Sequence, residues 1–397
     1  MNLEKVKSIT NRIMDVNRKL ADLGEPKIPI NFIGMAGVGK TSSLMQVAEE
    51  RGCHMETVVL SQLEEVGDIT GMPVKFYKLI DPQGQEVEMA ESVVPTLLNS
   101  GYTICPNCEP VTSFAKPSWV PEDLGQEFIL LLDDFTRCSK TFLQAIMQLL
   151  QFGSYGTWKL PKYTTILLSS NPEDGMYDVT EIDPALRSRM MNFVVDFDVK
   201  LWAKWAESKN KNGQLINFAL WNQKMFQTAN HSINARNYSM FIDALMGIKL
   251  DTKNMPEIIL MAQGIFGEEL SIAEDLRMFI DQQLDKLPTP NDIITKTWDD
   301  LEPMLTDILY KNGDYRTDIG FLLTVRFSNY LEEYFKNNKE KKKGEKIEKR
   351  LVELLTAPKP LLQENGLLEI VKTLITKFAA KCPTLVANPI IASKLLN

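Results

Sequence analysis

Apolar residues recur along the first half of the chain in two different patterns. Between residues 3 and 23 they return every three or four positions, which places them on one face of a helix that Gly24 and Pro26 end. Short runs rich in Ile, Leu and Val then predict buried strands at 28–33, 57–60, 128–132, 164–168 and 193–195. Helix-length segments, notably 41–51 and 140–152, lie between these runs. Because such alternation is typical of a parallel sheet covered on both faces, we expect an α/β core over residues 1–198.

The second half of the chain shows helical patterns in place of strands. They cover 201–206, 234–247 and 271–287, and Pro288 and Pro290 mark a boundary. We therefore expect a helical lid over 199–290 and a further helical region over 291–397, where apolar residues at 367–378 line one helix face. Within the core, residues 72–126 contain seven prolines and are expected to form an irregular insertion.

The overall charge argues against some classes of partner. The chain has 397 residues, with 44 Lys and Arg against 52 Asp and Glu, for a net charge of −8. It lacks the overall positive charge of a protein that wraps nucleic acid, although a local basic patch is left open. No apolar run approaches the ~18 residues of a membrane span, and residues 1–7 lack the apolar core of a signal peptide. We expect a cytoplasmic protein that has no membrane partner.

The cysteines do not suggest a disulfide framework. There are five, an odd number, spread over the whole chain, so reduced thiols are expected. Cys105 and Cys108 form a Cys-x-x-Cys, which is either half of a zinc site or an ordinary turn. The turn is favoured, because a structural zinc site needs four ligands and the chain has no second such pair and only two histidines.

The segment from Gly34 to Thr41 matches the phosphate-binding loop pattern G-x-x-x-x-G-K-[ST] at every fixed position. Glycines let successive backbone amides face a di- or triphosphate, and the following helix adds the positive end of its dipole. Lys40 would bridge the β- and γ-phosphates of ATP, and the Thr41 hydroxyl would hold Mg²⁺. The alternative is a tight turn without a ligand. The residues expected to contact the nucleotide are Gly34, Ala36, Gly37, Val38, Gly39, Lys40, Thr41 and Ser42.

Two carboxylates follow the apolar run at 128–132. In a parallel sheet, ligands bind at the carboxyl ends of the strands. Asp133 would therefore coordinate Mg²⁺ through water, and Asp134 would orient or deprotonate the attacking water. The alternative is that these acids begin a surface helix. The phosphate-binding loop upstream favours the metal-binding interpretation over this one.

These motifs, taken in order, resemble the AAA+ ATPases, and among them the MoxR-like and dynein-related group. The resemblance covers about residues 25 to 250. Beyond the phosphate-binding loop it rests on segments 67–73, 119–121, 131–137, 160–172 and 182–190, which are similar to ordered blocks of that family.

The resemblance implies roles for four further residues. Asn171 falls at the sensor 1 position, where a polar side chain contacts the attacking water and the γ-phosphate. Arg189, with Arg187 as a second candidate, falls at the arginine-finger position and would reach the nucleotide of a neighbouring subunit. Arg236 is similar to sensor 2, at the start of a lid helix. Their alternatives are an Asn-Pro turn for the asparagine and solvated surface side chains for the arginines.

Three residues depart from the family pattern, and they affect the expected rate of ATP hydrolysis more than the expectation that the nucleotide binds. Asp134 stands where the family usually has Glu, Thr136 replaces Asn, and Asn234-Ala235 replaces Ser-Pro. The resemblance implies a Mg²⁺-dependent ATPase that forms a hexameric ring and remodels a client or adaptor protein, in this group often one with a von Willebrand factor A domain. The insertion 72–126 would contact such a partner.

Two rival functions stay open. One is a nucleotide-switched scaffold that binds ATP and barely hydrolyses it, suggested by the shorter side chain of Asp134. The other is a nucleic-acid motor or loader, which the acidic composition disfavours. A GTPase is less consistent still, because no Asn-Lys-x-Asp motif occurs.

Overall fold

The chain folds into two compact units, Met1–Phe197 and Asp198–Asn397, in a computed structural model. The structure describes residues 1–106, 108–123, 125–156, 158–173, 177–227, 233–267, 271–281, 287–311, 314–337, 341–357 and 387–396. The predicted helical face at 367–378 lies outside these residues.

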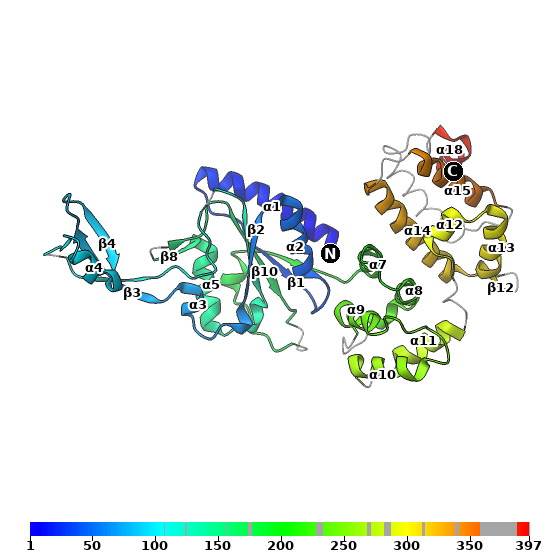
Figure 1. The fold of residues 1–397 in the computed structure, drawn as a ribbon, viewed down its shortest axis with the longest axis horizontal. Coiled ribbons are helices and arrows are strands. Elements are labelled where there is room, and N and C mark those ends of the chain that lie inside the picture. The colour runs from blue at the N-terminus through cyan, green and yellow to red at the C-terminus, as the bar shows by residue number, and fades with distance from the viewer. Residues whose placement is uncertain are drawn as a thin grey trace. The chain divides into compact units, whose positions relative to one another are not determined.

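A five-stranded parallel sheet forms the centre of the first unit (Figure 1). Its order is β11-β1-β10-β7-β2, and all four pairings are parallel. The strands are β1 (Ile30–Ile33), β2 (His54–Val59), β7 (Phe128–Asp133), β10 (Thr164–Ser170) and β11 (Met191–Val194). They are the five strands predicted from the apolar runs, so the expected α/β class is confirmed.

The helices around this sheet follow the predicted pattern. The predicted ones are α1 (Leu3–Leu23), α2 (Lys40–Arg51) and α5 (Lys140–Phe152), the short helices α3 (Gly67–Thr70) and α6 (Pro184–Arg187) were not predicted, and α4 (Val94–Leu98) belongs to the insertion. Gly24 ends α1 and Gly153 ends α5, both in the left-handed conformation that glycine adopts at low cost.

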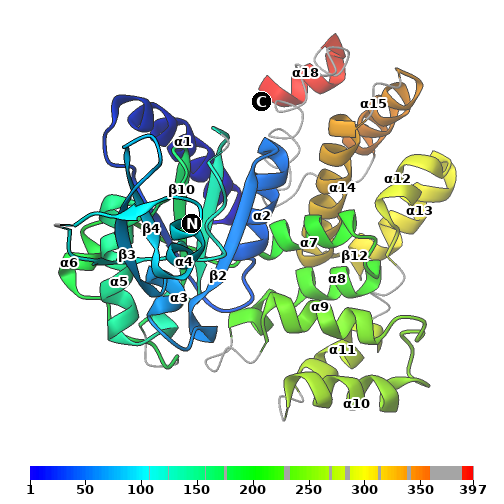
Figure 2. The same cartoon turned by 60° about the vertical axis from the view of Figure 1, so that its left-hand side comes forward.

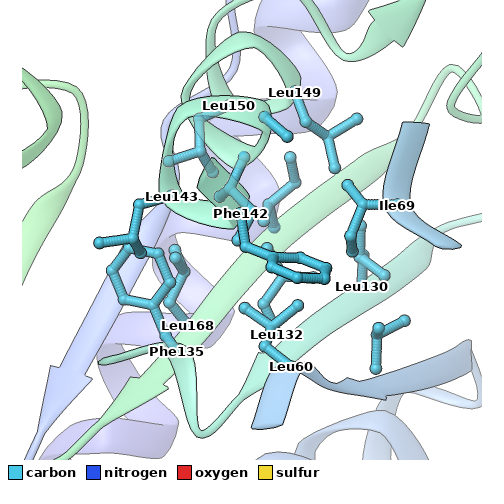
Figure 3. Packing of buried hydrophobic residues seen from close by; sticks show 14 of the residues in the cluster. Leu60, Ile69, Leu130, Leu132, Phe135, Phe142, Leu143, Leu149, Leu150 and Leu168 are labelled. Carbon is cyan, nitrogen blue, oxygen red and sulfur yellow. The ribbon is translucent and has the colours of Figure 1, made fainter. Parts of the chain in front are cut away.

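Side chains of the central strands alternate between two cores. Leu130 and Leu132 of β7 lie in a cluster with α5, whereas Ile129 and Leu131 lie in a second cluster with α1 and α2. Figure 3 shows the first cluster, in which Phe142 and Leu149 of α5 face these leucines. Burying each such side chain stabilises the fold by about 1.5–3 kcal/mol. This double burial explains why β7 is apolar at every position up to Asp133.

The insertion is more regular than expected. Residues 73–114 hold a four-stranded antiparallel sheet built from β3 (Pro73–Ile80), β4 (Glu86–Ala90), β5 (Thr103–Ile104) and β6 (Val111–Phe114). Figure 1 shows β3 and β4 standing away from the core sheet. The expectation of an irregular segment is wrong because the prolines fall mostly between strands, while β3 itself is rich in strand-forming Val, Phe, Tyr and Ile.

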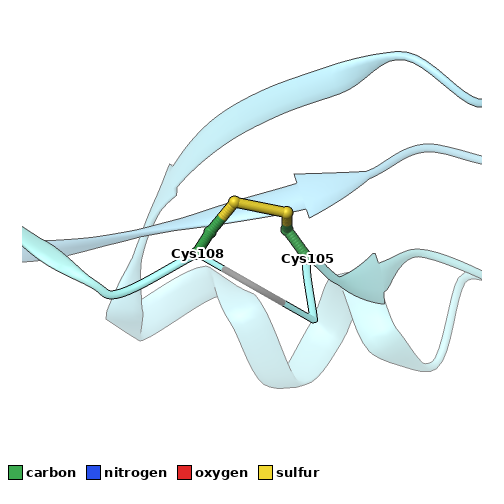
Figure 4. Close-up of a disulfide and its surroundings, with 2 residues drawn as sticks. All are labelled: Cys105 and Cys108. Carbon is green, nitrogen blue, oxygen red and sulfur yellow. A yellow bond between two sulfur atoms is a disulfide. The ribbon is translucent and has the colours of Figure 1, made fainter.

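Two cysteines of the insertion are bonded to each other. Cys105 and Cys108 form a disulfide (Figure 4), so the expectation of reduced thiols is wrong for this pair. Their spacing within one turn, with Cα atoms 5.4 Å apart, makes the bond geometrically accessible. Among the described residues, no group of three or more His, Cys, Asp or Glu side chains is placed to hold a metal ion.

The described residues of the second unit are mostly helical (Figure 2). Its helices are α7 (Val199–Ser208), α8 (Gly213–Trp221), α9 (Ala235–Ala244), α10 (Met255–Phe266), α11 (Ser271–Asp281), α12 (Pro290–Thr295), α13 (Trp298–Leu309), α14 (Thr317–Asn337), α15 (Lys341–Thr356) and α18 (Pro389–Leu396). A short hairpin of β12 (Tyr310–Lys311) and β13 (Asp314–Tyr315) joins α13 to α14, and β8 (Ser154–Tyr155) and β9 (Trp158–Lys159) form a similar hairpin in the first unit.

A buried ion pair links three helices of the second unit. Arg326 of α14 donates from Nε to Glu207 of α7 at 2.8 Å and from Nη1 to Asn217 of α8 at 2.9 Å. The side chains of Arg326 and Glu207 are only 8% and 15% exposed. Across the part of the chain that the structure describes, no helix has both the length and the apolar character that crossing a bilayer requires.

Candidate nucleotide site

The phosphate-binding loop leaves the carboxyl end of β1 and leads into α2. Gly34 lies so close to the segment after β11 of the same chain that a Cβ at this position would come 2.7 Å from the carbonyl oxygen of Val195. Gly37 and Gly39 have φ angles of +79° and +97°, a region that other residues adopt at a cost. Glycine is therefore required at these positions by the backbone itself.

Lys40 occupies the interior of the loop. Its ammonium donates to the carbonyl oxygens of Gly34 at 2.6 Å and Met35 at 3.1 Å, and the residue is 7% exposed. A buried cation enclosed by a turn of backbone provides both the charge and the donors that phosphate oxygens require. The loop fits a bound polyphosphate.

Thr41, in the first turn of α2, touches the end of β7. Its hydroxyl donates to Oδ2 of Asp133 at 2.9 Å, although 92 residues separate the two in sequence. Hydroxyl and carboxylate oxygens beside a phosphate-binding loop are the protein ligands that Mg²⁺ uses. The chemistry of this pair fits the metal that the sequence predicts.

Asp134, the second acid, has an unusual backbone. Its φ of +52° places it in the left-handed region, where Asp and Asn are the most frequent residues after glycine. Its carboxylate accepts a hydrogen bond of 3.4 Å from the Ser61 hydroxyl, just after β2. The backbone N–H of Asp134 donates to Oδ1 of Asp133 at 3.0 Å, so the two acids are held relative to each other.

Asn171 follows β10, the strand between β1 and β7 in the sheet. Its backbone N–H donates to the Thr136 hydroxyl at 3.4 Å, and both residues are buried. The expected sensor 1 residue and the segment that carries the acidic pair are thus in contact. The structure brings together four predicted features: the loop, Asp133, Asp134 and Asn171.

The two candidate finger arginines are placed differently from each other. Arg187 donates from Nη2 to both carboxylate oxygens of Glu173 at 3.2 Å, which ties it to the segment after Asn171. Arg189 comes two residues before β11 and contacts Gln151 at the end of α5. Because β11 runs parallel to β1, Arg189 lies at the edge of the sheet opposite the phosphate-binding loop.

Arg236 belongs to the second unit. It lies exposed in the first turn of α9, where the Asn234 side chain accepts hydrogen bonds from the backbone N–H groups of Arg236 and Asn237. The helix start predicted from Asn234-Ala235-Arg236 is present, and the role of Arg236 as sensor 2 stays a prediction.

Two residues at the site were missed by the sequence analysis. Ser61 follows a predicted strand directly, and the rule that polar residues at strand ends gather at one edge would have selected it. Tyr177, whose hydroxyl accepts a hydrogen bond of 3.2 Å from the Ala36 N–H, carries no motif that distinguishes it from other surface tyrosines.

Comparisons with known proteins include solved structures that share little sequence with this chain. No family model and no curated protein matches the chain. Among solved structures, it is similar to a mutant RuvB of Thermotoga maritima, at 14% identity over 80% of this chain and 88% of that chain, with a TM-score of 0.38. A second Thermotoga maritima RuvB, described as a Holliday junction branch migration motor, has 15% identity over 83% and 87%, with a TM-score of 0.36.

NtrX from Brucella abortus, solved in complex with ATP, has 13% identity over 85% of this chain and 64% of that chain, with a TM-score of 0.33. At these identities and TM-scores, the similarities do not bear on what this chain binds or catalyses.

Proposed function

We propose that the chain binds Mg²⁺–ATP at the carboxyl edge of its parallel sheet and hydrolyses it. The observation that carries the proposal is the 2.9 Å contact between the Thr41 hydroxyl and Asp133, directly beside the phosphate-binding loop. It joins the first turn of α2 to the end of β7, and in phosphate-binding-loop enzymes a loop hydroxyl and a strand-end acid at these two places hold Mg²⁺.

Each residue of the site has a distinct task in this proposal. The loop amides and Lys40 hold the phosphates and offset their charge. Asp134 and Asn171 orient the attacking water, and the carboxylate of Asp134 takes its proton. Mg²⁺, when bound, would neutralise charge on the phosphate oxygens, and Thr41 and Asp133 would hold it.

The position of Arg189 favours an oligomer. Arg189 lies at the edge of the sheet opposite the phosphate-binding loop of its own chain, which supports a role at another subunit's nucleotide. We infer a homo-oligomeric ring, a hexamer by resemblance to AAA+ ATPases, of the MoxR-like type that remodels a client or adaptor protein. A protein with a von Willebrand factor A domain is the partner class that this resemblance suggests, and the insertion is the surface we assign to it.

The test is steady-state ATP turnover by the purified full chain in Mg²⁺, with its mass measured with and without ATP. We expect turnover that Lys40→Ala abolishes, and an assembly that grows when ATP is added. Lys19→Ala, an exposed lysine of α1, is the matched control and should behave like the parent.

Other outcomes would select the rival functions. Tight ATP binding without turnover would identify a nucleotide-switched scaffold. Turnover stimulated many-fold by DNA or RNA would favour a nucleic-acid motor. Failure to bind ATP at millimolar concentration would refute all three.

A further inference from the structure

Tyr177 reaches the phosphate-binding loop from the segment that joins β10 to α6. Its hydroxyl oxygen accepts a 3.2 Å hydrogen bond from the backbone N–H of Ala36. On its other side, the guanidinium carbon of Arg137 lies 6.0 Å from the centre of its ring. The tyrosine therefore lies between the loop and the short helical turn Phe135–Arg137 that follows the acidic pair.

The segment carrying Tyr177 is fixed to the same turn three residues later. The backbone N–H of Thr180 donates to the carbonyl oxygen of Thr136 at 2.7 Å, and its hydroxyl donates to the carbonyl oxygen of Cys138 at 2.6 Å. These two bonds fix the backbone three residues after Tyr177 to the turn that Arg137 ends, on the side of the tyrosine away from Ala36.

The Ala36 N–H is one of the groups that a bound polyphosphate would use. Backbone amides of such loops are donors to phosphate oxygens. Ala36 lies on the part of the loop that leaves β1, next to the strand ends, whereas Lys40 begins α2. The terminal phosphate must lie on the strand-end side, because Asp134 and Asn171 have to reach the water that attacks it.

We propose that the Tyr177 hydroxyl occupies the place of a terminal-phosphate oxygen and must leave Ala36 when ATP binds, but not when ADP binds. This inference rests on the proposed ATP site. Tyr177 is then a residue that discriminates between nucleoside triphosphate and diphosphate, and its displacement signals the terminal phosphate to residues 177–180, which are bonded to the turn after the acidic pair.

The test compares Tyr177→Phe with the parent full chain by calorimetric titration with ADP and with a non-hydrolysable ATP analogue, both in Mg²⁺. The variant keeps the ring and removes only the hydroxyl. One hydrogen bond of ordinary strength corresponds to about threefold to tenfold in affinity. We expect the analogue to bind tighter by about that factor, while the affinity for ADP changes less than twofold.

Tyr77→Phe is the matched control, because the Tyr77 hydroxyl contacts Glu91 within the insertion. It should leave both affinities unchanged. Equal shifts for the two nucleotides, no shift for either, or weaker binding of the analogue to Tyr177→Phe would overturn the proposal. If the parent bound neither nucleotide, the proposed ATP site itself would fail, which is a different result.

Discussion

The hydroxyl of Thr41 donates a 2.9 Å hydrogen bond to Oδ2 of Asp133, joining two residues that are 92 positions apart. Both oxygens are expected to face Mg²⁺. Asp133→Asn removes the negative charge and should raise the Mg²⁺ concentration for half-maximal turnover by about tenfold or more. Thr41→Ser keeps the hydroxyl and should stay within a few-fold of the parent. A Mg²⁺ titration of turnover measures both, and an unchanged Mg²⁺ requirement in Asp133→Asn would contradict the assignment.

The left-handed backbone of Asp134 allows the role of its carboxylate to be tested separately from its effect on folding. Asn adopts this conformation as readily as Asp, so Asp134→Asn should fold normally. It should bind ATP but hydrolyse it very slowly, so that ATP stays bound. Asp134→Glu restores a longer base and should keep or raise turnover, with a slightly lower melting temperature because Glu is less suited to φ of +52°. Quench-flow measures ATP hydrolysis by each variant, and thermal melts measure the melting temperature of each. Identical turnover in both variants and the parent would remove Asp134 from the mechanism.

Arg189 should be dispensable for binding and essential for turnover. Arg189→Ala is expected to bind ATP with nearly the parent affinity and to lose about 10³-fold or more in rate, as is found for arginine fingers of phosphoryl-transfer enzymes. Mixing it with Lys40→Ala protein should restore part of the activity, because a Lys40→Ala subunit can supply its arginine to an intact neighbouring site. The absence of recovery at every mixing ratio would argue against action between subunits.

Arg187→Ala is the control for that experiment. Its guanidinium pairs with Glu173 of the same chain, so it should affect turnover less than Arg189→Ala does. A larger loss in Arg187→Ala would transfer the finger role to that residue.

The Cys138 thiol should be slow to react in the native protein. Burial raises its pKa to about 11, and only the thiolate attacks alkylating reagents. At pH 8 about 10⁻³ of the thiol is ionised, compared with about a tenth at a pKa of 9, and reactivity should rise as pH increases toward 11. Alkylation with iodoacetamide followed by peptide mass spectrometry measures this. Rapid labelling of Cys138 at pH 8 would show that the buried surroundings of this thiol open readily to solvent.

The buried pair of Arg326 and Glu207 should dominate the electrostatic stability of the second unit. Arg326→Leu leaves Glu207 without its cation and should lower the free energy of unfolding by about 3 kcal/mol. Arg277→Ala, which removes an exposed pair with Asp281, should cost no more than about 0.5 kcal/mol. Urea denaturation followed by circular dichroism compares the two. Equal losses would mean that the buried pair contributes no more than a surface one.

The core was predictable because its signals are local. Continuous apolar runs specify strands buried on both faces, and the glycines of the loop are required by positive φ angles and by the approach of Val195. The rule that ligands bind at the carboxyl ends of parallel strands then predicts the place of Asp133, whereas Asn171 was identified through the resemblance to AAA+ ATPases.

What the sequence did not reveal depends on contacts between distant segments or on competing local signals. The contact of Tyr177 with Ala36 spans 141 residues and has no periodic signature. In the insertion, frequent prolines concealed the alternation in β3. The bond between Cys105 and Cys108 was missed because an odd number of cysteines argued against disulfides in the chain as a whole.

The insertion enters and leaves the core at almost the same point. Ala115 donates from its backbone N–H to the carbonyl oxygen of Met72 at 2.9 Å, and Pro73 lies opposite Phe114 where β3 pairs with β6. The two ends of the insertion therefore lie as close together as two paired strands, whatever lies between them. Residues can be gained or lost beyond that junction without altering the spacing of the core strands, so the insertion is free to vary in length and sequence while the core sheet is preserved.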